Sequence, residues 1–111
     1  MINQGDGWTT VVEANKLKVY SLDKIFCEET TFNDKIIFTS LAAQGAALLV
    51  LTKKGELFKL GNVIYSWLRS DKPILSDVIK IEGSDPWTCI TKDGLYQVRS
   101  NRLIIEIVKL N

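Results

Sequence analysis

Short apolar runs separated by polar turns recur along this chain. In residues 8–22, 47–61 and 86–100, an apolar run leads through a polar turn into a second apolar run around an aromatic residue. These aromatics lie 38 residues apart, and an apolar residue precedes each of them by nine positions. The aromatics are Tyr20, Phe58 and Tyr96, and the apolar residues before them are Val11, Leu49 and Trp87. A period between about 20 and 50 residues indicates a repeat architecture.

The turns inside these segments have the composition of tight β-hairpins. Gly55 in TKKGEL and Gly94 in TKDGLY lie where a hairpin needs a positive φ angle, which a residue without a Cβ atom adopts at little cost. In the first segment Asn15 is the natural candidate for the left-handed conformation. The flanking runs are too short for helices and rich in β-forming residues. We therefore predict a hairpin in each segment.

Reading outward from the hairpins predicts about eleven strands in three units, at about residues 8–34, 35–72 and 73–111. The first unit lacks an opening strand, and the other two have four strands each. A helix is the alternative for the Ala-rich stretch 39–48 and for the tail 101–111, where β-branched residues favour a strand. A four-stranded unit of this length has the size of a propeller blade. We expect one all-β domain of about three four-stranded, blade-like antiparallel units, a partial β-propeller, with a compact β-barrel or sandwich as the alternative.

Residues 40–62 and 78–98 resemble repeats of the regulator of chromosome condensation family, in which apolar positions surround a Leu-Thr-x-x-Gly turn. The resemblance covers about half of the chain. The family's His before the second strand is absent from both copies, and Arg99-Ser100-Asn101 replaces the final Gly-x-Asn of the second copy. The matching residues are Leu41, Gly45, Leu49, Leu51, Thr52, Gly55, Leu57, Phe58, Gly61 and Asn62 in the first copy, and Gly83, Cys89, Ile90, Thr91, Gly94 and Tyr96 in the second.

The resemblance implies a β-propeller, and complete members of such families have about seven blades. Three blades cannot close a ring, and an open stack exposes strand edges and apolar faces. Four arrangements are open: pairing with a second copy, docking on a partner's incomplete propeller, a compact barrel or sandwich, or a place in a longer protein. We expect association with a protein partner or a homo-oligomer in preference to a free monomer.

Composition narrows the setting and the partners. The chain has 111 residues, 46% hydrophobic and 24% charged, with a formal net charge of +1. This charge and the lack of a basic run argue against nucleic acid as a partner. No apolar run approaches the roughly 20 residues of a membrane span, and the N-terminus does not read as a secretory signal. Cys27 and Cys89 are interpreted as free, buried thiols in an intracellular, cytoplasmic or nuclear protein, with a disulfide between them as the alternative.

The sequence offers little for catalysis, metal binding or cofactors. There is no His, so acid–base chemistry would fall to scattered carboxylates, Lys, Tyr or Cys. Glu28 and Glu29 are adjacent, so they would point to opposite faces of a strand and are interpreted as solvated charges. No zinc, calcium or phosphate-loop pattern is present. We predict no enzyme activity, no catalytic residue, no metal and no cofactor.

Aromatic residues are the best candidates for a contact surface. Trp and Tyr combine a large apolar face with a polar tip, which suits protein interfaces and stacking on sugars. Tyr65 and Trp67 alternate along one predicted strand and would share a face. Trp8 and Trp87 are weaker candidates, because the repeat position of Trp87 also fits a place in the core.

These observations rank the functions. The first is a non-enzymatic protein–protein interaction module or small subunit of a larger complex, which completes a propeller by self-association or with a partner. The second rests on the resemblance alone: its family includes a guanine-nucleotide exchange factor, which implies regulation of a small GTPase. The third is a glycan-binding propeller fragment.

Overall fold

The computed structural model describes residues 2–5, 7–21, 26–63 and 66–111, with side chains described for 7–21, 28–62 and 67–111. Strands account for most of these residues, and the only helical element among them is a short 3₁₀ turn, η1 (Ala43–Gly45). The strands are β1 (Ile2–Gly5), β2 (Trp8–Glu13), β3 (Lys16–Ser21), β4 (Phe26–Thr31), β5 (Ile36–Ala42), β6 (Ala47–Thr52), β7 (Leu57–Val63), β8 (Ser66–Arg69), β9 (Val78–Gly83), β10 (Trp87–Thr91), β11 (Gly94–Asn101) and β12 (Ile104–Lys109).

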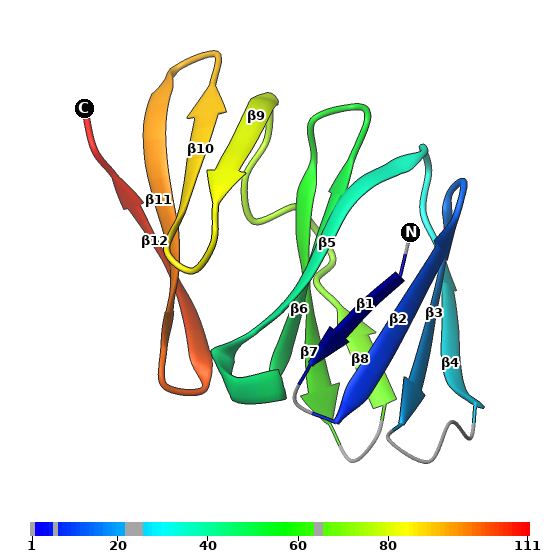
Figure 1. The fold of residues 1–111 in the computed structure, drawn as a ribbon. Coiled ribbons are helices and arrows are strands. Elements are labelled where there is room, and N and C mark those ends of the chain that lie inside the picture. Colours follow the sequence, from blue (N-terminus) through cyan, green and yellow to red (C-terminus); the bar gives the residue numbers. More distant parts are fainter. Residues whose placement is uncertain (1, 6, 22–25, 64–65) are drawn as a thin grey trace.

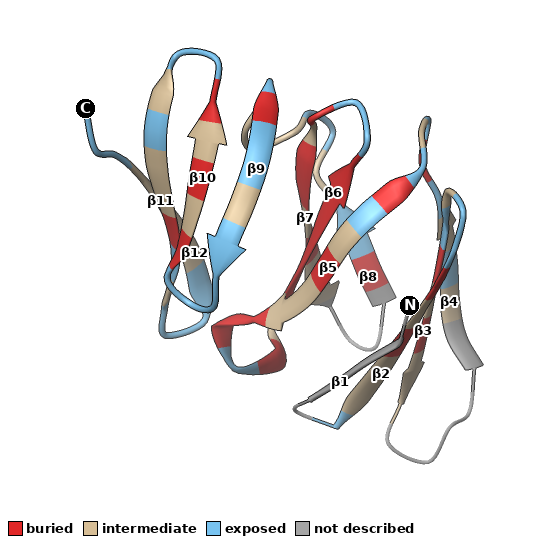
Figure 2. Ribbon diagram, turned by 45° about the horizontal axis from the view of Figure 1, so that its top comes forward, coloured by how far each residue is buried: buried red, intermediate tan, exposed pale blue. Residues whose placement is uncertain are grey.

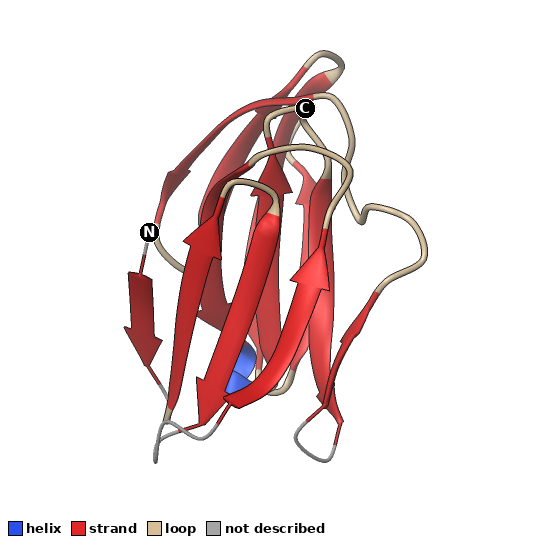
Figure 3. Ribbon diagram, turned by 90° about the vertical axis from the view of Figure 1, so that its right-hand side faces the viewer, coloured by secondary structure: helices blue, strands red, loops and turns tan. Residues whose placement is uncertain are grey.

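The strands form three antiparallel sheets, each made of four consecutive strands. β1–β4 form the first sheet, β5–β8 the second and β9–β12 the third, and in each sheet neighbours in sequence are neighbours in space. The second sheet lies between the other two (Figure 1). Seen from the side of the first sheet, the strands of the stack run roughly along one direction (Figure 3). The prediction of an all-β fold with three four-stranded, blade-like units is therefore confirmed.

Two details differ from the prediction. The first unit has its opening strand, because β1 pairs with β2 from Ile2↔Val11 to Gly5↔Trp8. The sequence INQG holds one apolar residue, so no hydrophobic pattern indicated this strand, and backbone pairing alone defines it. The described sheets are also separate and open, unlike the barrel or sandwich considered as the alternative. Within the Ala-rich stretch 39–48 only residues 43–45 are helical, as η1, and the rest belong largely to β5 and β6, while the tail contains the strand β12.

The hairpin turns confirm two of the three predictions about backbone conformation. Gly55 and Gly94 have φ angles of 89° and 142°. The prediction for Asn15 is wrong, because Ala14 takes the positive φ (53°) one residue earlier. Asn15 instead connects the hairpin to the segment after β4: its side-chain amide donates to the Phe32 carbonyl at 2.9 Å, and its own carbonyl accepts the Phe32 N–H at 2.9 Å.

Of the three predicted hairpins, the one between β6 and β7 has the longest loop, and this changes which residues share a face. The β6–β7 loop has three residues, 53–55, between the paired Thr52 and Glu56, whereas the other two hairpins have two-residue loops. Val50 rather than Leu49 therefore lies opposite Phe58. Equal spacing of nine positions before each aromatic does not place equivalent side chains on equivalent faces.

Two apolar layers join the three sheets. Side chains alternate along a strand, so Leu48 and Val50 of β6 pack toward the first sheet, while Leu49 and Leu51 pack toward the third. Every residue of β6 is buried (Figure 2). Such a continuous apolar run is typical of a strand covered on both faces. The second sheet is thus the centre of the core.

Backbone hydrogen bonds fix the first joint between sheets. Ile36, the first residue of β5, donates its N–H to the Ala14 carbonyl in the hairpin of the first sheet at 2.9 Å. The preceding carbonyl, that of Lys35, accepts the N–H of Lys53 in the hairpin of the second sheet at 2.7 Å. The connection between the sheets is thereby held to both hairpin tips.

The same arrangement recurs at the second joint. Val78, the first residue of β9, donates its N–H to the Gly55 carbonyl at 2.9 Å, and the Asp77 carbonyl accepts the Lys92 N–H at 3.2 Å. Gly55 has no room for a side chain here, because an added Cβ atom would lie 2.9 Å from the Val78 oxygen. Glycine at this position meets both the turn geometry and the close approach of β9.

Replacing Gly55 with alanine is expected to destabilise the protein strongly. The change combines a left-handed backbone, which costs about 1–3 kcal/mol for a residue with a side chain, with the clash against Val78. Gly61→Ala is the matched control, since an added Cβ atom there meets nothing within 4 Å. Urea denaturation measures both free energies of unfolding. Equal, small changes for the two variants would contradict this account of the joint.

Candidate protein-interaction surface

In each sheet, an apolar pair flanks the tip of the hairpin formed by its second and third strands. In the first two sheets this pair lies on the face that packs against the following sheet, and in the third sheet it lies on the corresponding face. The pairs are Val12–Leu17, Leu51–Leu57 and Ile90–Leu95. The next sheet covers the first two pairs, in which no residue is more than 8% exposed. The third pair has no sheet over it among the described residues: Leu95 is 36% exposed and Ile90 is half-buried. The position that receives a sheet twice within the chain is therefore open at its third occurrence.

We define the outer face of the third sheet as the side chains that alternate with those packed against the second sheet. Beside Leu95 lies Leu110, 51% exposed, whose N–H donates to the Leu95 carbonyl at 2.8 Å. The face is mixed in character, because an Arg99–Glu106 ion pair at 3.0 Å lies farther along it. Its members are Lys80 and Glu82 on β9, Thr88 and Ile90 on β10, Leu95, Gln97, Arg99 and Asn101 on β11, and Ile104, Glu106, Val108 and Leu110 on or just after β12.

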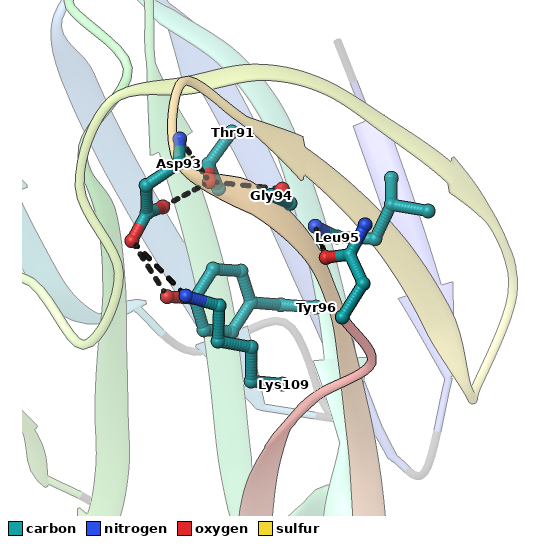
Figure 4. A network of polar contacts seen from close by, with 7 residues as sticks. Thr91, Asp93, Gly94, Leu95, Tyr96 and Lys109 are labelled. Atoms are coloured by element: carbon teal, nitrogen blue, oxygen red, sulfur yellow. Dashed lines mark hydrogen bonds and ion pairs between the residues drawn. The ribbon is translucent and has the colours of Figure 1, made fainter.

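The hairpin beneath this face is held by a polar network (Figure 4). The Thr91 hydroxyl donates to Asp93 Oδ1 at 2.6 Å, and the Tyr96 hydroxyl donates to Asp93 Oδ2 at 3.0 Å. Lys109 Nζ lies 3.8 Å from Asp93 Oδ2 and 5.8 Å from the centre of the Tyr96 ring. Asn111 Oδ1 accepts the Leu95 N–H at 2.8 Å. The network thus holds the β10–β11 hairpin that carries Leu95 and ties the backbone of Leu95 to Asn111.

The network also sets the protonation of its members. Hydrogen bonds from Thr91 and Tyr96, followed by the charge of Lys109, hold the pKa of Asp93 below its usual value. The hydrogen bond to Asp93 raises the pKa of Tyr96 above its usual value. Near neutral pH the pair therefore consists of a carboxylate and a neutral phenol, which suits a structural hydrogen bond.

Stability should depend on Asp93 in a pH-dependent way. Because its pKa is lowered in the folded state, its contribution is present above the usual value of 3.8 and is lost as the pH falls through the folded pKa. We expect Asp93→Asn to be less stable than wild type at pH 7, with the difference shrinking at low pH. Urea denaturation from pH 2.5 to 7, with Asp71→Asn as an exposed control, checks this. A difference that stays constant with pH would contradict the assignment.

Three of the four aromatic residues singled out from the sequence lie in the described part of the chain, and their surroundings differ. The structure buries Trp67 and Trp87, which are 2 and 3% exposed, in the layers between sheets. Trp8 is half-buried and meets Trp67 edge to face, with ring centres 5.2 Å apart. In the folded chain neither Trp67 nor Trp87 lies at the surface. Contact with a partner stays a prediction for Trp8, and Tyr65 lies outside the described residues.

The indoles and their neighbours join the sheets. Glu28 Oε2 accepts the backbone N–H of Trp67, so this carboxylate links β4 to β8 and is not merely a solvated charge. Arg69 donates to the Thr31 carbonyl at 3.0 Å, and its guanidinium lies 4.9 Å from the centre of the Phe32 ring. These contacts tie the outermost strands of the first and second sheets.

Cys89 is free and fully buried, as predicted. Burial raises the pKa of its thiol to about 11. The side chain of Cys27 is outside the described set, so its interpretation stays a prediction. Among the described residues, no group of three or more His, Cys, Asp or Glu side chains could hold a metal ion. No described helix has the length and apolarity needed to cross a membrane.

Cys89 should be unreactive in the native protein. At pH 8 a thiol with a pKa of about 11 is roughly one part in a thousand thiolate, and the fold also blocks access to it. In a Cys27→Ser variant, where Cys89 is the only thiol, we expect reaction with Ellman's reagent to be at least about 100-fold slower than in 8 M urea. Similar rates under both conditions would show that the layer between the second and third sheets is open.

Comparison with known proteins supports the fold. No family model matches the chain, and no curated protein matches it. Among solved structures, the N-terminal domain of Nup159, a β-propeller, aligns with a TM-score of 0.67 and 16% sequence identity. The alignment covers 100% of this chain and 29% of that chain. The propeller-like fold implied by the family resemblance is thus supported, whereas membership of the regulator of chromosome condensation family is not shown.

Sequence reasoning did not identify Leu95 or Leu110 as surface residues. The available signal was the repeat itself, because Leu95 lies 38 residues after Leu57. Because a sheet covers Leu57, an apolar residue at the equivalent position of the third sheet predicts that a sheet covers it too. Its exposure becomes visible only once the stacking order of the sheets is known.

Proposed function

We propose that the protein is a non-enzymatic protein–protein interaction module and a subunit of a larger propeller-like assembly. It binds by receiving another β-sheet on the outer face of its third sheet. The observation that carries this proposal is the Ile90–Leu95 pair, with Leu95 exposed and Ile90 half-buried, because it occupies the position of two pairs that sheets cover inside the chain.

The size of this face sets the expected affinity. A four-stranded sheet with strands of about six residues presents a face of roughly 20 by 19 Å. A contact of this size lies at the lower end of specific interfaces, where binding is weak and partners exchange. Burying a leucine side chain completely contributes about 1.5–3 kcal/mol. Leu95 and Leu110 together therefore supply an important part of the binding free energy, but not enough for a stable complex. We expect micromolar affinity, with the polar side chains of the outer face supplying the remaining contacts.

A charged substitution at Leu95 should abolish binding without unfolding the protein. Tagged wild type, Leu95→Glu and the control Leu68→Glu are used to purify partners from extracts of the source cells, with quantitative mass spectrometry as the readout. Leu68 is an exposed leucine on β8, away from the outer face. We expect a partner retained by wild type and by Leu68→Glu and lost at least about tenfold with Leu95→Glu. Equal recovery on all three proteins would contradict the proposed surface.

A further inference from the structure

We propose that the sheet received by the outer face of the third sheet is the first sheet of a second copy of this chain. The inference rests on the proposed function and specifies its partner. The third sheet of one copy would stack on the first sheet of the next, continuing the order in which the sheets stack within one chain.

The first sheet offers the side that such stacking requires. In the first joint, Phe58 projects from the second sheet toward the first and lies with its ring centre 5.4 Å from that of Phe32. In the second joint, Tyr96 packs from the third sheet into the layer shared with the second. Tyr20 is the corresponding aromatic of the first sheet. It alternates with the buried Val19, so it lies on the face turned away from the second sheet.

The two ends of the stack therefore carry the two halves of one repeated contact. The third sheet supplies the apolar pair Ile90–Leu95, and the first sheet supplies Tyr20. Leu110 adds to this match: it continues the last strand of its sheet, as Phe32 continues β4, and Phe32 is the residue that meets Phe58 in the first joint. Head-to-tail stacking would place Tyr20 of one copy against Leu95 and Leu110 of another.

Charge does not oppose this stacking. The free face of the first sheet carries Glu13, Lys16, Lys18 and Glu29, whose formal charges cancel, and Lys18 lies 3.9 Å from Glu13. The outer face of the third sheet carries two ion pairs, Arg99–Glu106 at 3.0 Å and Lys80–Glu82 at 2.7 Å. Two faces whose formal charges sum to zero neither attract nor repel each other strongly. We therefore expect association to change little between 50 and 500 mM salt.

A head-to-tail contact uses two different surfaces, which gives a test by complementation. The full chain is examined by light scattering after size exclusion between 10 and 500 µM. We expect a concentration-dependent mass of at least twice the 12.5 kDa of one chain. Leu95→Glu and Tyr20→Glu should each weaken self-association at least tenfold, with Leu68→Glu as the control and circular dichroism to verify folding. A mixture of Leu95→Glu and Tyr20→Glu should associate again, because one intact surface remains on each.

Other results separate the alternatives. If Leu95→Glu dissociates the protein and Tyr20→Glu does not, the third sheets pair with each other and the head-to-tail inference is wrong. If the protein stays monomeric at 500 µM, the inference that the partner is a second copy is wrong. The proposed function is then tested on a chain extended after Asn111 by a duplicate of residues 70–111. In each chain the change in the urea midpoint caused by Leu95→Glu is measured. A large fall in the extended chain and a small fall in the natural chain would support the outer face as a sheet-binding surface. Equal falls in both would overturn the proposed function as well.

Discussion

The structure depends on covering the apolar faces of its sheets. An antiparallel sheet with apolar side chains on one face is stable only if a neighbour removes that face from water, and β6 is buried on both. The second sheet meets this condition by lying between the other two. Among the described residues each outer sheet has one covered face, and the free faces differ: that of the first carries Glu13, Lys16, Lys18 and Glu29 beside Val11 and Tyr20, and that of the third carries the exposed Leu95 and Leu110. Because of this difference, the two ends of the stack are not equivalent.

At the two joints, apolar side chains and polar groups have different roles. Apolar layers supply most of the favourable free energy, and they do so without strong directional preference. The alignment of one sheet on the next comes from the backbone hydrogen bonds at the hairpin tips and from contacts such as the Ser100 hydroxyl, which accepts the Ala43 N–H at 2.8 Å. A sheet cannot slide along its neighbour without losing them. The order of the sheets is thus set by apolar burial and their alignment by polar groups.

Much of the fold could be predicted from the sequence, because hairpins leave local signals. The 38-residue spacing and the glycines at 55 and 94 indicated the repeated hairpins and the blade-like units. The opening strand β1 was missed, since its residues carry no apolar alternation and pairing with β2 defines it. The face of each side chain was also not predictable, because one additional loop residue at 53–55 reverses the faces that Leu49 and Val50 present. The surface around Leu95 follows from stacking order, which is a long-range property.

At the joints between sheets, main-chain atoms connect the hairpin tips, and this affects how the sequence can vary. At four positions, the groups that connect successive hairpins are an amide N–H and a carbonyl oxygen, which every residue except proline possesses. Apart from Gly55, these bonds place little demand on side-chain identity. Substitutions can therefore accumulate while the sheets keep their alignment, provided that the layers stay apolar. A similarity in fold at 16% identity is what such a main-chain connection permits.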